Sequence, residues 1–265
     1  VGGYELDFQG DLHERMYTFN DWLKPLFNNP VFSDARDKIP AFGFDQTKVK
    51  GLVKNQFEGS IDTGKMMEAF ARKAREAGVQ FYTQTEVLHY VEQTNGVEVT
   101  VSTTDGPLQL FTDQLALCTN AFTKTLLPDA DLEPGRGMVV ITKPLTWVPP
   151  QGTFHYHSGY NYFRNAGKRS PLGGARHLDL KGETTTKEGI NILLKEQLIE
   201  DLKSFIAANR PLEIDYAWSG IMAFGEGKAP LLLHPSARVH AAVRLGGMGV
   251  ALGTGLGKEL AQRIF

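Results

Sequence analysis

The sequence is poor in cysteine, in long apolar runs and in excess charge. Cys118 is the only cysteine among 265 residues, which excludes an intrachain disulfide framework and a cysteine-rich zinc site. A single cysteine also fits a reducing compartment, so we expect the protein to be cytoplasmic. No run of about 18 apolar residues is present, and the first residues lack the pattern of a signal peptide. The sequence therefore predicts a soluble protein.

The charge is nearly balanced. There are 28 Lys and Arg residues against 30 Asp and Glu residues, giving a net charge of −2. This composition lacks the basic surface that a nucleic acid or an anionic membrane requires, so we expect a small-molecule partner. Because the chain begins at Val1 rather than at Met, we expect it to be a piece of something longer.

The apolar spacing predicts helices among many short strands. The helices are expected over 11–29, from a cap at Asp62 or Thr63 to Gly78, around the stripe Leu194, Leu198, Leu202, Phe205 and Ile206, and from about 250 onward. Strands are expected at 79–82, around the hairpin turns Asn95-Gly96 and Asp105-Gly106, and at 114–120, 137–142, 153–157, 160–165, 169–175, 212–217 and 239–243. This order predicts an α/β (α+β) fold whose mixed, largely antiparallel sheet has flanking helices.

Two glycine-rich stretches resemble phosphate-binding loops but fail in detail. In "RLGGMGVALGTG", Gly249 is followed three residues later by Leu252, so the dinucleotide fingerprint is incomplete. Gly64 and Lys65 end a second candidate loop, but Met66 stands where a hydroxyl must hold Mg²⁺. The sequence therefore favours neither a complete dinucleotide site nor a nucleoside triphosphatase.

The first stretch still predicts a strand that enters Gly246 and Gly247 and continues as a helix near Gly249. Such an arrangement points free N–H groups and the positive end of a helix dipole at a partly anionic atom. The alternative is that the glycines only let the last helix pack closely against a strand.

Four blocks together resemble the FAD-dependent oxidoreductases of the D-amino-acid oxidase, glycine oxidase and sarcosine oxidase group. They are "EGSIDTGKMMEAFARKAREAGVQFYTQTEV", "QLALCTNAFTKTLLPDADLEPGRGMVVIT", "YAWSGIMAFGEGKAPLLL" and "VHAAVRLGGMGVALGTGLGKELAQRI". The resemblance implies that the last block faces the pyrimidine edge of FAD, that the segment after Cys118 turns beside the pyrophosphate, and that one backbone segment faces the adenine. The implied cofactor-binding residues are Gly246, Gly247, Met248, Gly249 and Val250, then Thr119, Asn120 and Ala121, and Val87.

The chain departs from that family pattern in three ways. The N-terminal dinucleotide-binding segment is missing, so the resemblance implies a substrate domain over 1–60 and 137–235 and a partial FAD-binding domain over 61–136 and 236–265. Met222 in "WSGIM" stands where amino-acid-oxidising relatives carry an arginine for the substrate carboxylate, which favours an amine or a differently anchored substrate. No cysteine shortly precedes the last glycine block, so the FAD is expected to be noncovalent.

Several side chains are candidates for substrate binding. Tyr162 and Arg164 share one face of a predicted strand with Tyr160, and Arg176 follows soon after. Lys228 lies in a stretch that resembles the family's segment under the flavin. The alternatives are a surface sheet with a paired arginine and a solvated loop lysine.

We expect no metal site. His155 and His157 fall on one side of a predicted strand, but no third ligand follows at ordinary spacing. Cys118 lies in the apolar run "LALCTNAF" and is expected to be buried and inert.

The resemblance implies an enzyme that oxidises the C–N bond of an amine or amino acid by hydride transfer to FAD, with oxygen as the electron acceptor. The alternative is a non-catalytic, flavin-free fragment or binding module. Its partner would be a missing N-terminal segment or a second copy in a homodimer.

Overall fold

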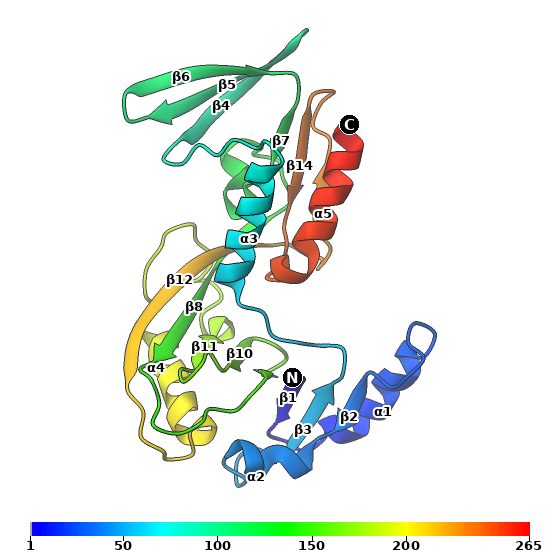
Figure 1. The fold of residues 1–265 in the computed structure, drawn as a ribbon, viewed down its shortest axis with the longest axis vertical. Coiled ribbons are helices and arrows are strands. Elements are labelled where there is room, and N and C mark those ends of the chain that lie inside the picture. The colour runs from blue at the N-terminus through cyan, green and yellow to red at the C-terminus, as the bar shows by residue number, and fades with distance from the viewer. Residues whose placement is uncertain (1) are drawn as a thin grey trace. The chain divides into compact units, whose positions relative to one another are not determined.

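The computed structural model describes residues 2–265, and these divide into two compact units (Figure 1). Unit 1 contains the described residues of Val1–Ile61, Gly137–Glu183 and Glu188–Gly220. Unit 2 contains Asp62–Arg136, Thr184–Lys187 and Ile221–Phe265. Residues 221–235, which the sequence analysis grouped with a substrate domain, pack in unit 2. The α/β fold class with mixed sheets and flanking helices is confirmed.

Unit 1 is built on an eight-stranded sheet with the order β12-β8-β11-β10-β9-β1-β3-β2. Its strands are β1 (Gly3–Asp7), β2 (Phe32–Asp34), β3 (Gly51–Asn55), β8 (Glu133–Thr142), β9 (Thr153–Tyr156), β10 (Asn161–Arg164), β11 (Pro171–Gly174) and β12 (Ile214–Phe224). Residues 133–136 of β8 and 221–224 of β12 belong to unit 2. Strands β1 and β9 are parallel, whereas β1–β3, β2–β3, β9–β10, β10–β11 and β8–β11 are antiparallel. The sheet is therefore mixed and largely antiparallel.

One face of this sheet carries the core of unit 1. Helix α4 (Ile192–Asp201) continues as a π-helical turn over Leu202–Ile206 and buries the whole predicted stripe. It belongs to one cluster with the sheet residues Phe154, Tyr156 and Phe163. The opposite face of β9 and β10 presents His155, Tyr162 and Arg164, since successive strand residues alternate between faces.

The remaining helices of unit 1 are short. They are α1 (Leu12–Leu23), α2 (Ile39–Phe42) and the 3₁₀ turns Arg36–Lys38 and Arg176–Leu178. The predicted helix over 11–29 stops at Leu23, two residues before Pro25, because proline restricts the residue before it and offers no N–H.

Unit 2 contains two sheets and two long helices. Its elements are α3 (Thr63–Glu76), β4 (Glu86–Gln93), β5 (Gly96–Thr103), β6 (Gly106–Thr112), β7 (Leu115–Leu117), a 3₁₀ turn at Asn120–Thr125, β13 (Leu231–Leu233), β14 (Val239–Val243) and α5 (Gly249–Ile264). Strands β4, β5 and β6 form the two predicted hairpins. Strand β14 pairs antiparallel with β13 and parallel with β7. The residues Val97, Val99, Val101, Leu117 and Val239 form one core cluster.

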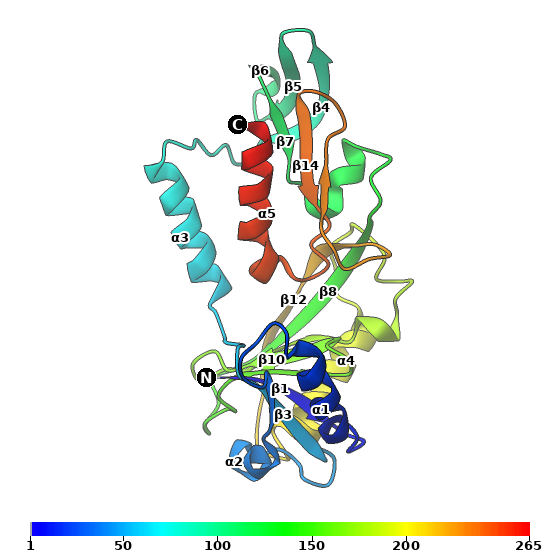
Figure 2. The ribbon, with the colours of Figure 1, turned by 90° about the vertical axis from the view of Figure 1, so that its right-hand side faces the viewer.

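Helix α3 has the predicted N-cap, since the Asp62 carboxylate accepts a hydrogen bond from the backbone N–H of Lys65 at 3.1 Å. In the described chain, none of its side chains is buried, and Figure 2 shows the helix standing apart from α5, β7 and β14 of the same unit. Residues 79–82, which were expected to form a strand, have no strand partner among the described residues, so that prediction is wrong. Short apolar runs do not reveal whether a neighbouring strand is present.

Cys118 is exposed, which corrects the expectation of a buried thiol. It directly follows β7, which is an edge strand of the sheet β13-β14-β7 in the described chain. No helix among the described residues has the length and apolar character needed to cross a membrane.

Candidate functional site

The turn between β14 and α5 is the most unusual backbone segment of unit 2. All residues of β14 are buried, and the chain then passes through Arg244 (φ +61°), Gly246 (φ +57°) and Gly247 (φ +80°) before α5 begins. These angles lie in the left-handed region, which glycine adopts at little cost. A Cβ atom on Gly247 would lie 3.7 Å from the Met222 sulfur, so conformation rather than crowding requires this glycine.

Three backbone N–H groups of this turn have no acceptor. Those of Gly247, Gly249 and Val250 donate to no atom of the described residues, and no side chain caps α5. Helix α5 has 16 residues, so its N-terminus adds the positive end of a helix dipole to these free donors. The turn can therefore hold a partly anionic group, as its glycine spacing predicts.

The structure brings the Thr119–Ala121 segment beside this turn. The side-chain oxygen of Asn120 accepts hydrogen bonds from the backbone N–H groups of Arg244 at 3.1 Å and Leu245 at 3.4 Å. Thr119 and Thr123 share a hydroxyl hydrogen bond at 3.0 Å, and Ala121 is buried. Two of the predicted cofactor segments thus meet within unit 2.

An arginine that the sequence analysis did not single out anchors the turn. The Arg244 guanidinium is 9 % exposed, pairs with the Asp131 carboxylate at 2.6 Å and donates to the carbonyl oxygens of Asp131 and Ala229. A Cβ atom on Gly225 would lie 2.6 Å from Arg244 Cδ, so Gly225 leaves the space that this side chain fills. In the sequence, the sign that Arg244 has a structural role is its position directly after the apolar run "VHAAV".

Met222 and Lys228 also lie near the turn. The backbone N–H of Gly246 donates to the Ala223 carbonyl oxygen at 2.9 Å, which ties the end of β12 to the turn. A Cβ atom on Gly246 would lie 3.9 Å from the Lys228 carbonyl oxygen. Met222 is half-buried and Lys228 is exposed. Their substrate-binding roles remain predictions.

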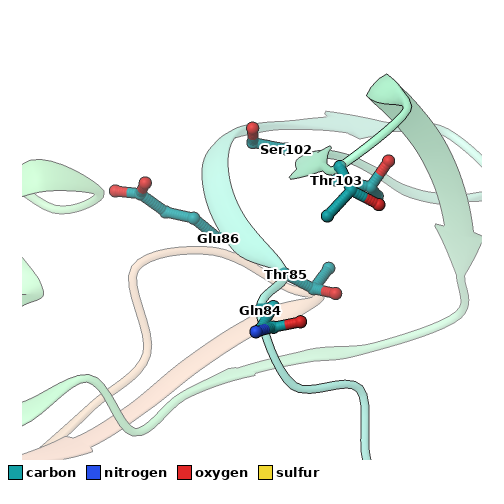
Figure 3. Close-up of a pocket in the computed structure, with 6 residues that line it drawn as sticks. Gln84, Thr85, Glu86, Ser102 and Thr103 are labelled. Atoms are coloured by element: carbon teal, nitrogen blue, oxygen red, sulfur yellow. The ribbon is translucent and has the colours of Figure 1, made fainter.

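Val87 lies on β4 opposite Val101 and packs against the core cluster of Val97, Val99 and Val101. Next to it, the ends of β4 and β5 border an open hollow of about 490 Å³. The hollow is lined by Gln84, Thr85, Glu86, Ser102, Thr103 and Thr104. In Figure 3 the Glu86 carboxylate points away from Thr85 and Thr103, so hydroxyl groups dominate this polar surface. That Val87 faces an adenine remains a prediction.

The substrate candidates Tyr162 and Arg164 lie on β10 in unit 1. Tyr162 pairs with Gly173 of β11, and a Cβ atom on Gly173 would lie 2.6 Å from the Tyr162 ring. The ring therefore lies across a glycine, and although Tyr162 is 44 % exposed, partial desolvation against the sheet raises its pKa. The Arg164 guanidinium donates to the carbonyl oxygen of Asn165 at 3.0 Å.

Arg176 lies beyond β11 in a 3₁₀ turn whose N-cap, Ala175, has φ +61°. It is half-buried and does not share β10 with Tyr162 and Arg164. The roles of these three residues in substrate binding remain predictions.

The two histidines do not share a strand as expected. Strand β9 ends at Tyr156, and His157 (φ +51°) begins a left-handed turn with Ser158 and Gly159. Its ring lies 5.6 Å from that of His177 between centroids. Among residues 2–265 there is no group of three side chains that could hold a metal ion.

An acidic residue of unit 1 was missed by the sequence analysis. Glu5 on β1 pairs with His155 on β9, and His155 pairs with Tyr162 on β10, so the three form one row on the face opposite the core. Burial, followed by the charges of Glu58 and Asp7, raises the pKa of Glu5 to about 7. A lone glutamate on a short strand gave no sign of this in the sequence.

The sequence matches the family of FAD-dependent oxidoreductases over residues 19–263. No match was found among curated proteins.

Solved structures show the same fold at low sequence identity. L-proline dehydrogenase from P. horikoshii is 20 % identical, with a TM-score of 0.78, over 100 % of this chain and 72 % of that one. Glycine oxidase from Geobacillus kaustophilus is 17 % identical, with a TM-score of 0.83, over 99 % and 70 %. L-amino acid deaminase from Proteus vulgaris, with its specific insertion deleted, is 15 % identical, with a TM-score of 0.76, over 99 % and 68 %.

Proposed function

Because the chain belongs to the family of FAD-dependent oxidoreductases, we propose that it forms part of an enzyme that oxidises the C–N bond of a small amine or amino acid. The observation that carries this proposal is the β14–α5 turn, whose free N–H groups at Gly247, Gly249 and Val250 suit an atom that gains negative charge. The first N–H groups of every helix lack a partner, but here no side chain caps them and the glycines at 246, 247 and 249 leave them open to a cofactor.

The residues present fit a noncovalently bound FAD. Gly246, Gly247, Met248, Gly249 and Val250 would meet the pyrimidine edge, Thr119, Asn120 and Ala121 the pyrophosphate, and Val87 the adenine. When bound, FAD supplies an acceptor for the hydride removed from the carbon that carries the nitrogen. The chain's own contribution is to present backbone donors without side-chain hindrance and to orient the substrate.

Because position 222 is a methionine, we propose that the substrate is not anchored by a carboxylate–arginine contact at this position. Met222 offers only a thioether near Gly247, which favours an amine or a differently anchored amino acid. Tyr162, Arg164, Arg176 and Lys228 are the proposed substrate contacts. Oxygen is the proposed final acceptor, with peroxide as its product.

A second candidate is a flavin-free fragment or binding module, and the exposed helix α3 favours it. Met67 is 59 % and Phe70 44 % exposed, so an apolar face lacks a cover within the described chain. This chain matches 72 % and 70 % of the length of two solved structures. We propose that the apolar face of α3 is covered either by a segment like the unmatched part of those structures or by a second copy of this chain.

The test is a visible absorbance spectrum of the purified protein before and after addition of FAD, with bound flavin separated from free flavin. We expect a retained flavin band, followed by peroxide formation in a screen of amines and amino acids. If no flavin is retained, the 265-residue chain is not a working oxidase and the second candidate gains. Bound flavin with reduction but no peroxide would overturn only the choice of oxygen as acceptor.

A further inference from the structure

Asn120 joins two segments that are far apart along the chain. Its side-chain oxygen accepts from the consecutive backbone N–H groups of Arg244 and Leu245, which are 124 and 125 residues away. Asn120 itself has φ +43°, a left-handed conformation that asparagine and aspartate adopt more readily than most residues. One side chain thus fixes two successive peptides at the start of the β14–α5 turn.

The first of these peptides belongs to a residue in a strained conformation. Arg244 has φ +61°, which is uncommon for a residue with a long side chain. Asp131 and the Ala229 carbonyl oxygen hold its guanidinium, whereas Asn120 holds its backbone N–H. The side chain and the backbone of Arg244 are therefore fixed by different partners.

Beyond Leu245 the turn has fewer supports. The Gly246 N–H donates to the Ala223 carbonyl oxygen at 2.9 Å and the Met248 N–H donates to the Leu245 carbonyl oxygen at 2.8 Å, whereas the N–H groups of Gly247, Gly249 and Val250 form no hydrogen bond in the described chain. Because Met248 is held by Leu245, the direction of the free donors depends on how the turn is fixed at Arg244 and Leu245 as well as at Gly246.

Building on the proposed function, we propose that Asn120 is a positioning residue for the flavin. It acts through the Arg244 and Leu245 peptides to aim the free N–H groups of the turn at the pyrimidine edge. The side-chain oxygen of Asn120 is thus engaged by the turn, whereas its Nδ2 remains the group that can donate to the pyrophosphate assigned to this segment.

The test compares two substitutions by hydrogen exchange of the flavin-free chain. Asn120→Gly keeps access to positive φ but removes the acceptor, whereas Asn120→Asp keeps both. We expect the amides of Arg244 and Leu245 to exchange about tenfold faster in Asn120→Gly and near the wild-type rate in Asn120→Asp. The amides of Val99 and Val101 in β5 serve as the internal reference, and an unchanged rate at residues 244 and 245 would overturn the inference.

A second measurement decides the matter if Asn120→Gly does not fold. In Asn120→Asp, two backbone N–H groups would stabilise the charged form of a carboxylate at a half-buried position, so we expect its pKa to lie below the ordinary value of about 3.9. NMR titration of the introduced carboxylate gives this value directly. An ordinary or raised pKa would show that the two donors do not depend on this side chain.

Titration with FAD separates this inference from the proposed function. We expect Asn120→Gly to weaken flavin binding about tenfold and to shift the visible spectrum of the bound flavin. Asn120→Asp keeps the acceptor for the turn, so its bound flavin should keep the wild-type spectrum, although the added negative charge beside the pyrophosphate segment weakens its affinity. If the wild-type chain binds flavin and Asn120→Gly binds it equally well, the positioning role is overturned alone. If the wild-type chain binds no flavin, the proposed function fails together with the flavin part of this inference.

Discussion

At the scale of single residues, Gly247 is required by its backbone conformation. Its φ of +80° is unfavourable for any residue with a side chain, although a Cβ atom would make only ordinary contact with Met222 at 3.7 Å. Gly247→Ala should therefore reduce the free energy of unfolding by about 1–3 kcal/mol or distort the turn. Chemical denaturation measures the first effect, and flavin affinity measures the second.

Gly253 provides a matched control for that substitution. It lies within α5, and a Cβ atom there would meet no atom within 4 Å. Gly253→Ala should stabilise the chain by about 0.5–1 kcal/mol, because alanine loses less conformational freedom than glycine in a helix. If Gly247→Ala and Gly253→Ala changed the free energy of unfolding equally, the turn would not require a glycine at position 247.

Gly173 and Tyr162 form a second residue-level test. A Cβ atom on Gly173 would lie 2.6 Å from the Tyr162 ring, so Gly173→Ala must displace the ring. Because the displaced atoms are the outer end of a side chain that is 44 % exposed, we expect a cost of only about 1 kcal/mol in unfolding free energy. In the background of Tyr162→Ala the same substitution should cost much less. A double-mutant cycle by denaturation measures this coupling. Additive effects would show that the two residues do not touch.

The backbone conformation of a single residue could be predicted from the sequence better than the side-chain contacts of that residue. The glycines of the β14–α5 turn could be predicted because the sequence around them limits what the backbone can do. The pairing of Arg244 with Asp131 could not be, since the two residues are 113 positions apart and either has many possible partners. The raised pKa of Glu5 likewise depends first on its burial in the folded sheet, and then on the charges of Glu58, which is 53 positions away, and of Asp7 on the same strand.

At the scale of elements, a chain of hydrogen bonds joins β14 and α5 to the residue that precedes β7 and the residue that follows β13. Arg263 donates to His234 Nε2 at 3.0 Å, His234 and His240 meet through their Nδ1 atoms at 2.8 Å, and His240 Nε2 meets the Gln114 side-chain oxygen at 2.9 Å. Arg263 can only donate, so His234 carries its proton on Nδ1 and His240 carries its proton on Nε2. Both imidazoles must be neutral for this arrangement to exist.

Acid should weaken this network. Burial, followed by the charge of His234, lowers the pKa of His240 below 6.5, while Glu92 opposes the shift. The unfolded chain then binds the proton more readily, so the stability is full above pH 6.5 and is lost as the pH falls toward the folded pKa. We expect denaturation at a series of pH values to show this loss.

His240→Asn separates titration from packing. It should lower the stability at neutral pH by about 1 kcal/mol for the lost bond to Gln114, and it should flatten the pH dependence below 6.5. His89→Asn, at an exposed histidine on β4, is the control and should leave the acid loss in place. An acid loss that persists fully in His240→Asn would place its origin elsewhere.

Elements were predictable where local signals agree. The α4 stripe and the cap of α3 combine spacing with capping, and both are confirmed. The helix predicted over 11–29 is longer than the observed helix, because the apolar spacing continues past Pro25 whereas α1 ends at Leu23. The segment 79–82 shows that strand propensity without a neighbouring strand does not make a strand.

At the scale of the whole molecule, the order of motifs along the chain was more informative than any one of them. No single block satisfies a complete nucleotide-binding pattern, yet their succession indicates the family that the match over 19–263 establishes. The extent of unit 2 could not be predicted in the same way, because residues 184–187 and 221–235 join it through long-range packing.

The uncovered face of α3 predicts how this chain behaves alone. Met67 and Phe70 expose apolar surface on a helix with no buried side chain, and water disfavours such surface by about 25 cal/mol for each Å². The 265-residue chain should therefore self-associate, and the double substitution Met67→Lys with Phe70→Lys should return it to monomers. Sedimentation velocity over a range of protein concentrations measures the change.

Glu68→Lys at an exposed position of the same helix is the matched control, because it makes the charge more positive by two units, as the double substitution does, without altering apolar area. It should leave self-association unchanged, which separates burial of the Met67 and Phe70 side chains from charge effects. If the wild-type chain stays monomeric at high concentration, the exposed apolar face of α3 does not drive self-association. Association that survives the double substitution would move the contact to another surface, such as the open edge of β7.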